Sequence, residues 1–122
     1  PYNCSVAVIE PDANGKMKKV SSVNVAKPEN EDIYYMEIAE MYVKDDILIV
    51  IVTCHIFSEE SERYYYTYDG MYYYGAYDSK ITMAACFDIS KKEAPVEKWR
   101  FYQDGDYISS RLIGNQFVVL SK

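Results

Sequence analysis

Residues that could do chemistry are few in this chain of 122 residues, and their spacing limits what they could do. His55 is the only histidine, so a Ser-His-Asp triad could be built only around His55. A metal site with two histidines cannot be built from this chain. A histidine that directly follows an apolar run also fits a strand end with ordinary hydrogen bonds. No glycine-rich phosphate loop occurs. We therefore expect no catalytic residues in this chain.

Two carboxylates flank a glycine at Asp104-Gly105-Asp106, close to Arg111. Carboxylate oxygens are the ligands that calcium prefers, which makes Asp104 and Asp106 weak metal candidates. Only two carboxylates are local, however, and the spacing of an EF-hand is absent. The structural interpretation is an Asp-Gly turn and an Asp–Arg pair that holds adjacent strands, and we expect no cofactor.

Tyrosine is concentrated in one stretch of the chain. The chain has 14 tyrosines, and eight of them lie between positions 64 and 77, around an Asp69-Gly70 turn signal. We expect a tyrosine-lined hairpin whose cross-strand pairs stabilise it, or whose tyrosines form a rigid, amphipathic contact surface for a glycan, peptide or cell-wall polymer. The candidate contact residues are Tyr65, Tyr66, Tyr68, Tyr72, Tyr73 and Tyr74.

The charge balance excludes some partners. The net charge is −6, so the chain has no electrostatic reason to bind nucleic acid or an anionic membrane surface. No apolar run is long enough to cross a bilayer. The chain begins at Pro1 without an initiator methionine, and we expect it to be excised from a longer protein.

Two of the three cysteines end apolar runs. Cys54 and Cys86 are expected to be buried, and they could form a disulfide if their strands are neighbours. No pair of cysteines, with Cys4 included, has a metal-ligand spacing.

Short apolar runs separated by turn signals predict β-strands throughout. Residues 47–52 are six consecutive apolar residues, which indicates a strand buried on both faces. Residues 33–43 could also fit two helical turns, but their tyrosine and β-branched residues favour a strand. In 96–102, alternation places Glu97, Trp99 and Phe101 on one face and Arg100 on the other, as in an outer strand.

The chain can be laid on itself. Residues 41–50 match 111–120 in pattern, which aligns Asp45 with Asn115, and the hairpins that precede them also match. Four-stranded repeating units are typical of β-propeller blades. We therefore expect an all-β fold of antiparallel, four-stranded, blade-like sheets. We assign 5–26 to the outer hairpin of a preceding blade, 33–101 to one full blade with an insertion at 58–79, and 104–122 to the inner hairpin of the next blade.

The stretch Phe101-Tyr102-Gln103-Asp104-Gly105-Asp106-Tyr107-Ile108-Ser109-Ser110-Arg111-Leu112-Ile113-Gly114-Asn115 resembles bacterial secreted proteins with a C-terminal β-propeller domain, which are distantly related to WD-repeat propellers. Cys86-Phe87-Asp88-Ile89-Ser90 followed by Pro95 is similar to the same family. The resemblance implies an extracellular or envelope-anchored bacterial protein and supplies no catalytic residues. It gives a structural motif whose members are Asp104, Gly105, Asp106, Ser109, Ser110 and Arg111.

These observations favour a non-catalytic binding or scaffold module with a glycan, cell-wall or protein ligand. The alternative is a hydrolase whose site forms only around the central channel of an intact propeller, with Asp106 and Arg111 contributing. A fragment of a propeller exposes apolar faces and strand edges, so we also expect the isolated chain to self-associate.

Overall fold

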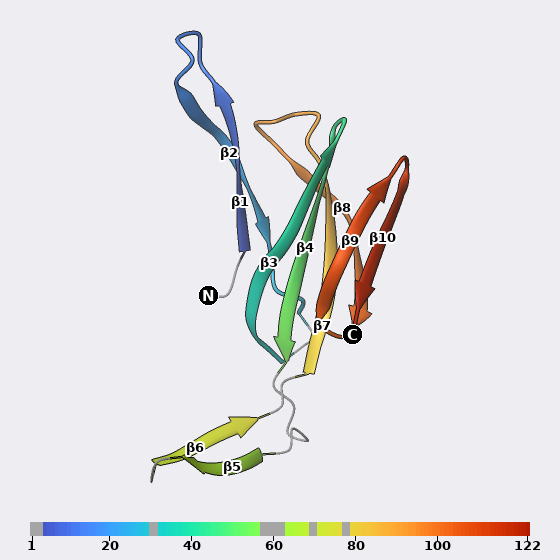
Figure 1. Cartoon of the computed structure of the whole chain (residues 1–122). Helices are drawn as coiled ribbons and strands as arrows, with labels where there is room; N and C mark the ends of the chain where they lie inside the picture. The colour runs from blue at the N-terminus through green and yellow to red at the C-terminus, as the bar shows by residue number, and fades with distance from the viewer. Residues whose placement is uncertain (1–3, 30–31, 57–62, 69–70, 77–78) are drawn as a thin grey trace.

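The structure is a computed structural model that describes residues 4–29, 32–56, 63–68, 71–76 and 79–122, with 63–68 and 71–76 described by their backbone pairing. The described residues form ten strands and no helix (Figure 1). The strands are β1 (Cys4–Pro11), β2 (Met17–Val25), β3 (Ile33–Lys44), β4 (Ile47–Ile56), β5 (Arg63–Tyr68), β6 (Met71–Ala76), β7 (Ser79–Asp88), β8 (Val96–Asp104), β9 (Tyr107–Ile113) and β10 (Gln116–Ser121).

A four-stranded antiparallel sheet with the order β3-β4-β7-β8 forms the centre of the molecule. Its second strand, β4, is buried from Leu48 to Cys54, as the apolar run predicts. Residues 33–43 lie in β3 and pair with β4, so the strand prediction is confirmed over the helical alternative. Pairing with β4 decides between the two, because two turns of helix at 33–43 would leave the backbone groups on this edge of β4 unpaired.

Two hairpins cover opposite faces of this central sheet (Figure 1). The β1–β2 hairpin packs Val25 against the face that carries Val50, and the β9–β10 hairpin packs Phe117 against the face that carries Ile51. Full burial of one such side chain is worth roughly 1.5–3 kcal/mol. The core is therefore two apolar layers, one on each side of β4.

The inner hairpins β3–β4 and β9–β10 repeat one another in detail. Both turn through two residues, and the first turn residue has a positive φ in each, 52° at Asp45 and 59° at Gly114. Both also carry a β-bulge at the same position before the turn, at Ala39 and at Ile108. The structure therefore aligns Asp45 with Gly114. The alignment of Asp45 with Asn115 expected from the sequence pattern is wrong by one position, because it ignores which turn residue adopts the positive φ.

The outer hairpins β1–β2 and β7–β8 also share one register. The bulged residue is Val20 in β2 and Lys98 in β8, opposite the steps Val8/Ile9 and Cys86/Phe87. Every paired position of β1–β2 up to Glu10 therefore maps onto β7–β8, with Val8 aligned with Cys86. Both repeats thus contain the same outer hairpin with the same register.

The all-β, antiparallel fold class is confirmed. The assignment of 5–26, 33–101 and 104–122 to three successive blades stays a prediction. The β5–β6 hairpin is inserted between β4 and β7, and residues 58–62 and 77–78 of the expected insertion lie outside the described residues. No helix among the described residues is long and apolar enough to span a membrane.

Candidate functional site: a cleft at the insertion end of the central sheet

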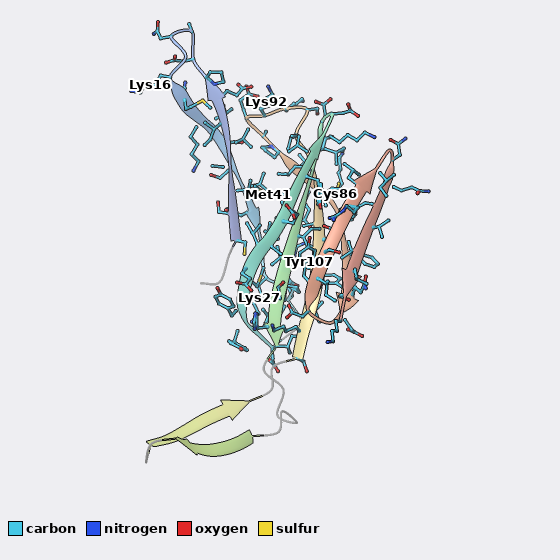
Figure 2. All side chains as sticks on the ribbon, in the orientation of Figure 1. Lys16, Lys27, Met41, Cys86, Lys92 and Tyr107 are labelled. Atoms are coloured by element: carbon cyan, nitrogen blue, oxygen red, sulfur yellow. The ribbon has the colours of Figure 1, made fainter. Side chains whose placement is uncertain are left out.

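A cleft of about 660 Å³ opens between the connector that follows β2 and the end of β8. The connector contributes residues 26–29, and Ile81 of β7 and Asp104 of β8, which pair with each other, mark the end of the sheet from which β5–β6 is inserted. Figure 2 shows Lys27 at this end and Lys92 at the opposite end. The cleft is lined by Ala26, Lys27, Pro28, Glu29, Ile81, Glu97, Arg100, Tyr102 and Asp104.

Arg100 of β8 connects the two walls of the cleft, because it binds both Glu97 of β8 and the connector. Its guanidinium binds both carboxylate oxygens of Glu97, with Nη2 at 2.8 Å from Oε2, and donates from Nη1 to the carbonyl oxygen of Ala26 at 2.7 Å. The hydrogen bonds to Glu97 raise the pKa of Arg100 above its usual range, against the opposing effect of burial. The connector is therefore fixed to β8 by a permanently charged group.

This pair exists because β8 is bulged at Lys98. The pairs Phe87–Glu97 and Cys86–Trp99 leave Lys98 without an opposite residue, so Glu97 shares the face of Arg100 and not the face of Trp99. The face assignment from simple alternation is wrong for Glu97, since one extra residue inverts the alternation.

The Asp104–Asp106 turn is tied to the first residues of β7. Asp106 Oδ2 lies 2.7 Å from Lys80 Nζ, Gly105 N donates to the carbonyl oxygen of Lys80, and Thr82 Oγ1 donates to the carbonyl oxygen of Gly105. Lys80, and not Arg111, is the cation beside Asp106, and Arg111 donates instead to the carbonyl oxygen of Ser110. These bonds position the start of β9.

The two metal candidates lie in different settings. Asp104 lines the cleft, whereas the Asp106 carboxylate is bound by Lys80. No group of three or more His, Cys, Asp or Glu residues suited to a metal ion occurs in the part of the chain that the structure describes. The described geometry therefore supplies no further ligand to either carboxylate.

Gly105 must be glycine for two reasons. Its φ is +99°, and a Cβ built there would lie 2.6 Å from the carbonyl oxygen of Lys122. Asp106 and Lys122 exchange two backbone hydrogen bonds at this point, which extends the β9–β10 pairing. The Asp-Gly-Asp part of the motif is thus explained by close approach of two backbones.

A hydroxyl network links β3 to β9. Ser110 is buried, and its Oγ lies 2.9 Å from the hydroxyl of Tyr42 and 2.9 Å from that of Tyr107. Tyr42 also donates to the carbonyl oxygen of Ser110. These bonds explain Ser110 of the motif and the neighbouring Tyr107, while Ser109 lies in β9 opposite Leu120.

His55 lies near the end of β4 beside two tyrosines of β3. Its ring meets those of Tyr35 and Tyr34 edge to face, with centroids 5.2 Å and 6.0 Å apart. Its Nε2 lies 3.8 Å from Glu37 Oε1, an ion pair when the histidine is protonated. This is an aromatic cluster at a strand end.

The three cysteines are free thiols. β4 and β7 are neighbours, but Cys54 lies opposite Ile81 and Cys86 lies opposite Ile49, so the two thiols lie toward opposite ends of the strand pair. They also belong to different core layers. The possible Cys54–Cys86 disulfide is therefore excluded by geometry. Burial and the neighbouring Cys4 thiol raise the pKa of Cys54 to about 11.

The tyrosine candidates form the expected hairpin at the level of the backbone. Tyr65 pairs with Tyr74 and Tyr66 with Tyr73, which places 66, 68 and 73 at positions on one face and 65, 72 and 74 on the other. The side chains, and the Asp69-Gly70 turn, lie outside the described residues. Sequence reasoning missed Glu97, Arg100 and Tyr102 as cleft residues, because the opposite wall is distant in the sequence: Ala26, which accepts a hydrogen bond from Arg100, lies 74 positions away from it.

A family model described as a beta propeller domain matches residues 2–122. The match spans nearly the whole chain, and the chain therefore belongs to the beta propeller domain family. No curated protein and no solved structure matches the chain.

Proposed function

We propose that this chain is a non-catalytic binding or scaffold module of an extracellular or envelope-anchored bacterial β-propeller. The bacterial and secreted parts of the proposal are supported by the resemblance at residues 101–115. The binding part is supported by one observation: the cleft beside Arg100 and the tyrosine-rich β5–β6 hairpin occur at the same end of the central sheet.

The chemistry of the cleft favours a hydroxyl-rich or amide-rich polymer. Tyr102 is about half exposed and offers a flat apolar surface, and the carboxylates of Asp104 and Glu29 accept hydrogen bonds. A glycan or cell-wall fragment, or a peptide segment, matches this combination.

Glu97 of the cleft is poorly suited to serve as the acid of a hydrolase. A glycoside hydrolase needs one carboxylic acid that is kept protonated beside a second carboxylate. Here Glu97 is held in a bidentate pair with Arg100, and Asp106 is paired with Lys80. These two carboxylates are thus committed to cations, which leaves Asp104 and Glu29 of the cleft lining to accept hydrogen bonds from a ligand.

Binding to immobilised glycans, peptidoglycan fragments and peptides tests the proposal. Tyr102→Ser should weaken binding at least tenfold through the cleft. Two matched triple variants test the hairpin, Tyr66→Ser/Tyr68→Ser/Tyr73→Ser on one face and Tyr65→Ser/Tyr72→Ser/Tyr74→Ser on the other. Loss of binding in only one triple variant would identify the contact face. Unchanged binding in every folded variant, or no binding by the unmodified chain, would contradict the proposal.

A further inference from the structure

The two hairpins that flank the central sheet each leave one strand edge open. Among the described residues, β10 pairs only with β9, and β1 pairs only with β2. An open edge presents unpaired N–H and C=O groups to any strand of suitable register. These edges lie on opposite sides of the molecule (Figure 1).

The repeats show which strand each edge lacks. β10 is the counterpart of β4, which pairs with β7 in the central sheet, and β1 is the counterpart of β7. β1 and β9 run in the same direction as β3 and β7, and β2 and β10 run in the opposite one (Figure 1). A β1 strand placed beside β10 would therefore be antiparallel to it, as β7 is to β4.

We propose that a second copy of this chain docks head to tail on the first, so that its β1–β2 hairpin completes a four-stranded sheet with the order β9-β10-β1-β2. The proposal does not depend on the ligand proposed above.

The register that follows is apolar over its four middle positions. The register between β10 and β1 follows from the observed pairing of β4 with β7. Each residue of β4 is replaced by its counterpart in β10, using the alignment of Asp45 with Gly114. Each residue of β7 is replaced by its counterpart in β1, using the alignment of Cys86 with Val8. In this register, apolar residues of one copy face apolar residues of the other at four successive positions. The pairs are Phe117 with Ile9, Val118 with Val8, Val119 with Ala7, and Leu120 with Val6 of the second copy.

The same placement covers apolar side chains that the single chain exposes. Trp99 and Phe101 are about half exposed and line a cavity of about 580 Å³ with Phe117. In the docked pair, the outward face of the second copy's β1–β2 hairpin, which carries the half-exposed Ile9 and the exposed Met17, lies over this cavity.

The reverse face is matched as well. Val118 and Leu120 of β10 are about half exposed on the side away from their own central sheet. Met41 and Val43 of β3 are exposed on the face that also carries Val50. Docking places Val118 and Leu120 of one copy over Met41 and Val43 of the other copy. The exposed apolar residues thus form two complementary sets.

The proposed interface uses β10 of one copy and β1 of the next, which are two different surfaces. The same interface can therefore form again with a third copy. A head-to-tail interface produces a closed ring when its rotation closes. Leaving β5 and β6 aside, the described residues of each copy contribute eight strands, which is enough for two four-stranded sheets. Propellers have about four to eight such sheets, which corresponds to rings of about two to four copies.

Light scattering after size exclusion measures the assembly directly. The unmodified chain should have a mass of two, three or four times its 14.2 kDa. A monomer at every concentration up to the solubility limit would overturn the proposal.

Two variants test the head-to-tail geometry. Val118→Lys blocks β10, and Ile9→Lys blocks β1; both positions are exposed in the single chain, so each variant should fold and remain monomeric. An equimolar mixture should form a one-to-one dimer and nothing larger, because only one unblocked β10 and one unblocked β1 remain. Asn14→Lys adds the same charge at the exposed β1–β2 turn and should assemble like the unmodified chain.

Circular dichroism establishes that each variant is folded. A mixture of folded variants that stays monomeric would overturn the proposal, as would a Val118→Lys or Ile9→Lys variant that still forms the ring. A two-fold symmetric dimer through β10 would appear as loss of assembly in Val118→Lys alone. This result would also contradict the head-to-tail interface between β10 and β1.

Discussion

The hydroxyl of Tyr42 in β3 lies 2.9 Å from Oγ of the buried Ser110 in β9 and also donates to the carbonyl oxygen of Ser110. This pair joins the first strand of the central sheet to the first strand of the neighbouring hairpin. Together with the ring contact between Tyr42 and Phe117, at a centroid distance of 5.5 Å, it holds the β9–β10 hairpin against one face of the β3–β4 hairpin.

Tyr42→Phe should lower the free energy of unfolding by about 1–2 kcal/mol, because it removes hydrogen bonds to a buried partner while it keeps the ring. Urea unfolding followed by circular dichroism measures this. Tyr107→Phe removes one hydroxyl and should cost less, since Ser110 keeps Tyr42. Equal stability of Tyr42→Phe and the unmodified chain would show that the network contributes nothing.

Gly105→Ala should destabilise the chain by roughly 1–3 kcal/mol, since a side chain must be held at positive φ and against a backbone oxygen. Gly15→Ala is the matched control, because Gly15 also has a positive φ, 78°, but has nothing within 4 Å of a built Cβ. It should cost about 1 kcal/mol or less. The contact with Lys122 would be irrelevant if thermal unfolding shifted equally in both variants.

The pKa of Asp88 is lowered to about 2 by hydrogen bonds from the hydroxyl and backbone N–H of Ser90. A lowered pKa means that this carboxylate stabilises the fold above its ordinary pKa of 3.8, and that its contribution is lost as the pH falls toward 2. In Ser90→Ala, NMR titration should show the pKa of Asp88 closer to 3.8. An unchanged pKa of Asp88 in that variant would exclude the Ser90 hydroxyl as a cause, since Ser90→Ala keeps the backbone N–H.

The thiol of Cys54 should resist alkylation at neutral pH, because it is buried and its pKa is raised to about 11. Mass spectrometry after brief iodoacetamide treatment should find Cys54 and the buried Cys86 unmodified in the folded chain and modified in urea. Oxidation of the folded chain should also leave these two thiols unlinked. A Cys54–Cys86 disulfide peptide would contradict the observed register.

The β10–β1 register predicts a cross-link between copies. In the central sheet, Thr53 of β4 pairs with Thr82 of β7. The equivalent positions at the proposed interface are Lys122 of one copy and Cys4 of the next. Lys122→Cys should therefore form an intermolecular disulfide with Cys4 under mild oxidation, seen by non-reducing electrophoresis and peptide mapping. Gln116→Cys, at the other end of β10, should form none. Equal cross-linking of both variants would indicate random contact.

Sequence reasoning predicts the strands well here because burial and turn chemistry are local. The run 47–52 and the turns at 45–46 and 114–115 are found where the residue types indicate. Bulges are not visible in such patterns, since one extra residue in a strand needs no distinctive residue type and leaves the composition almost unchanged. The bulge at Lys98 therefore inverts the predicted face of Glu97.

The partners within the site could not be predicted for a different reason. Asp106 meets Lys80 across 26 residues, and Tyr42 meets Ser110 across 68 residues. Such contacts depend on how hairpins stack, and local spacing carries no information on stacking. The internal repeat was the one long-range signal, and an error of a single position in its alignment was enough to misplace the turn residues.

The bulges also show where the chain has changed length. The segment between the bulges at Val20 and Ala39 is longer than the equivalent segment between those at Lys98 and Ile108, and its connector provides residues 26–29 of the cleft. The β5–β6 insertion enters at this same end, while the turns of the inner hairpins at the other end have equal lengths in both repeats. One end of the sheet thus tolerates evolutionary insertion without disturbing either hairpin, and it is where new sequences could be grafted for engineering.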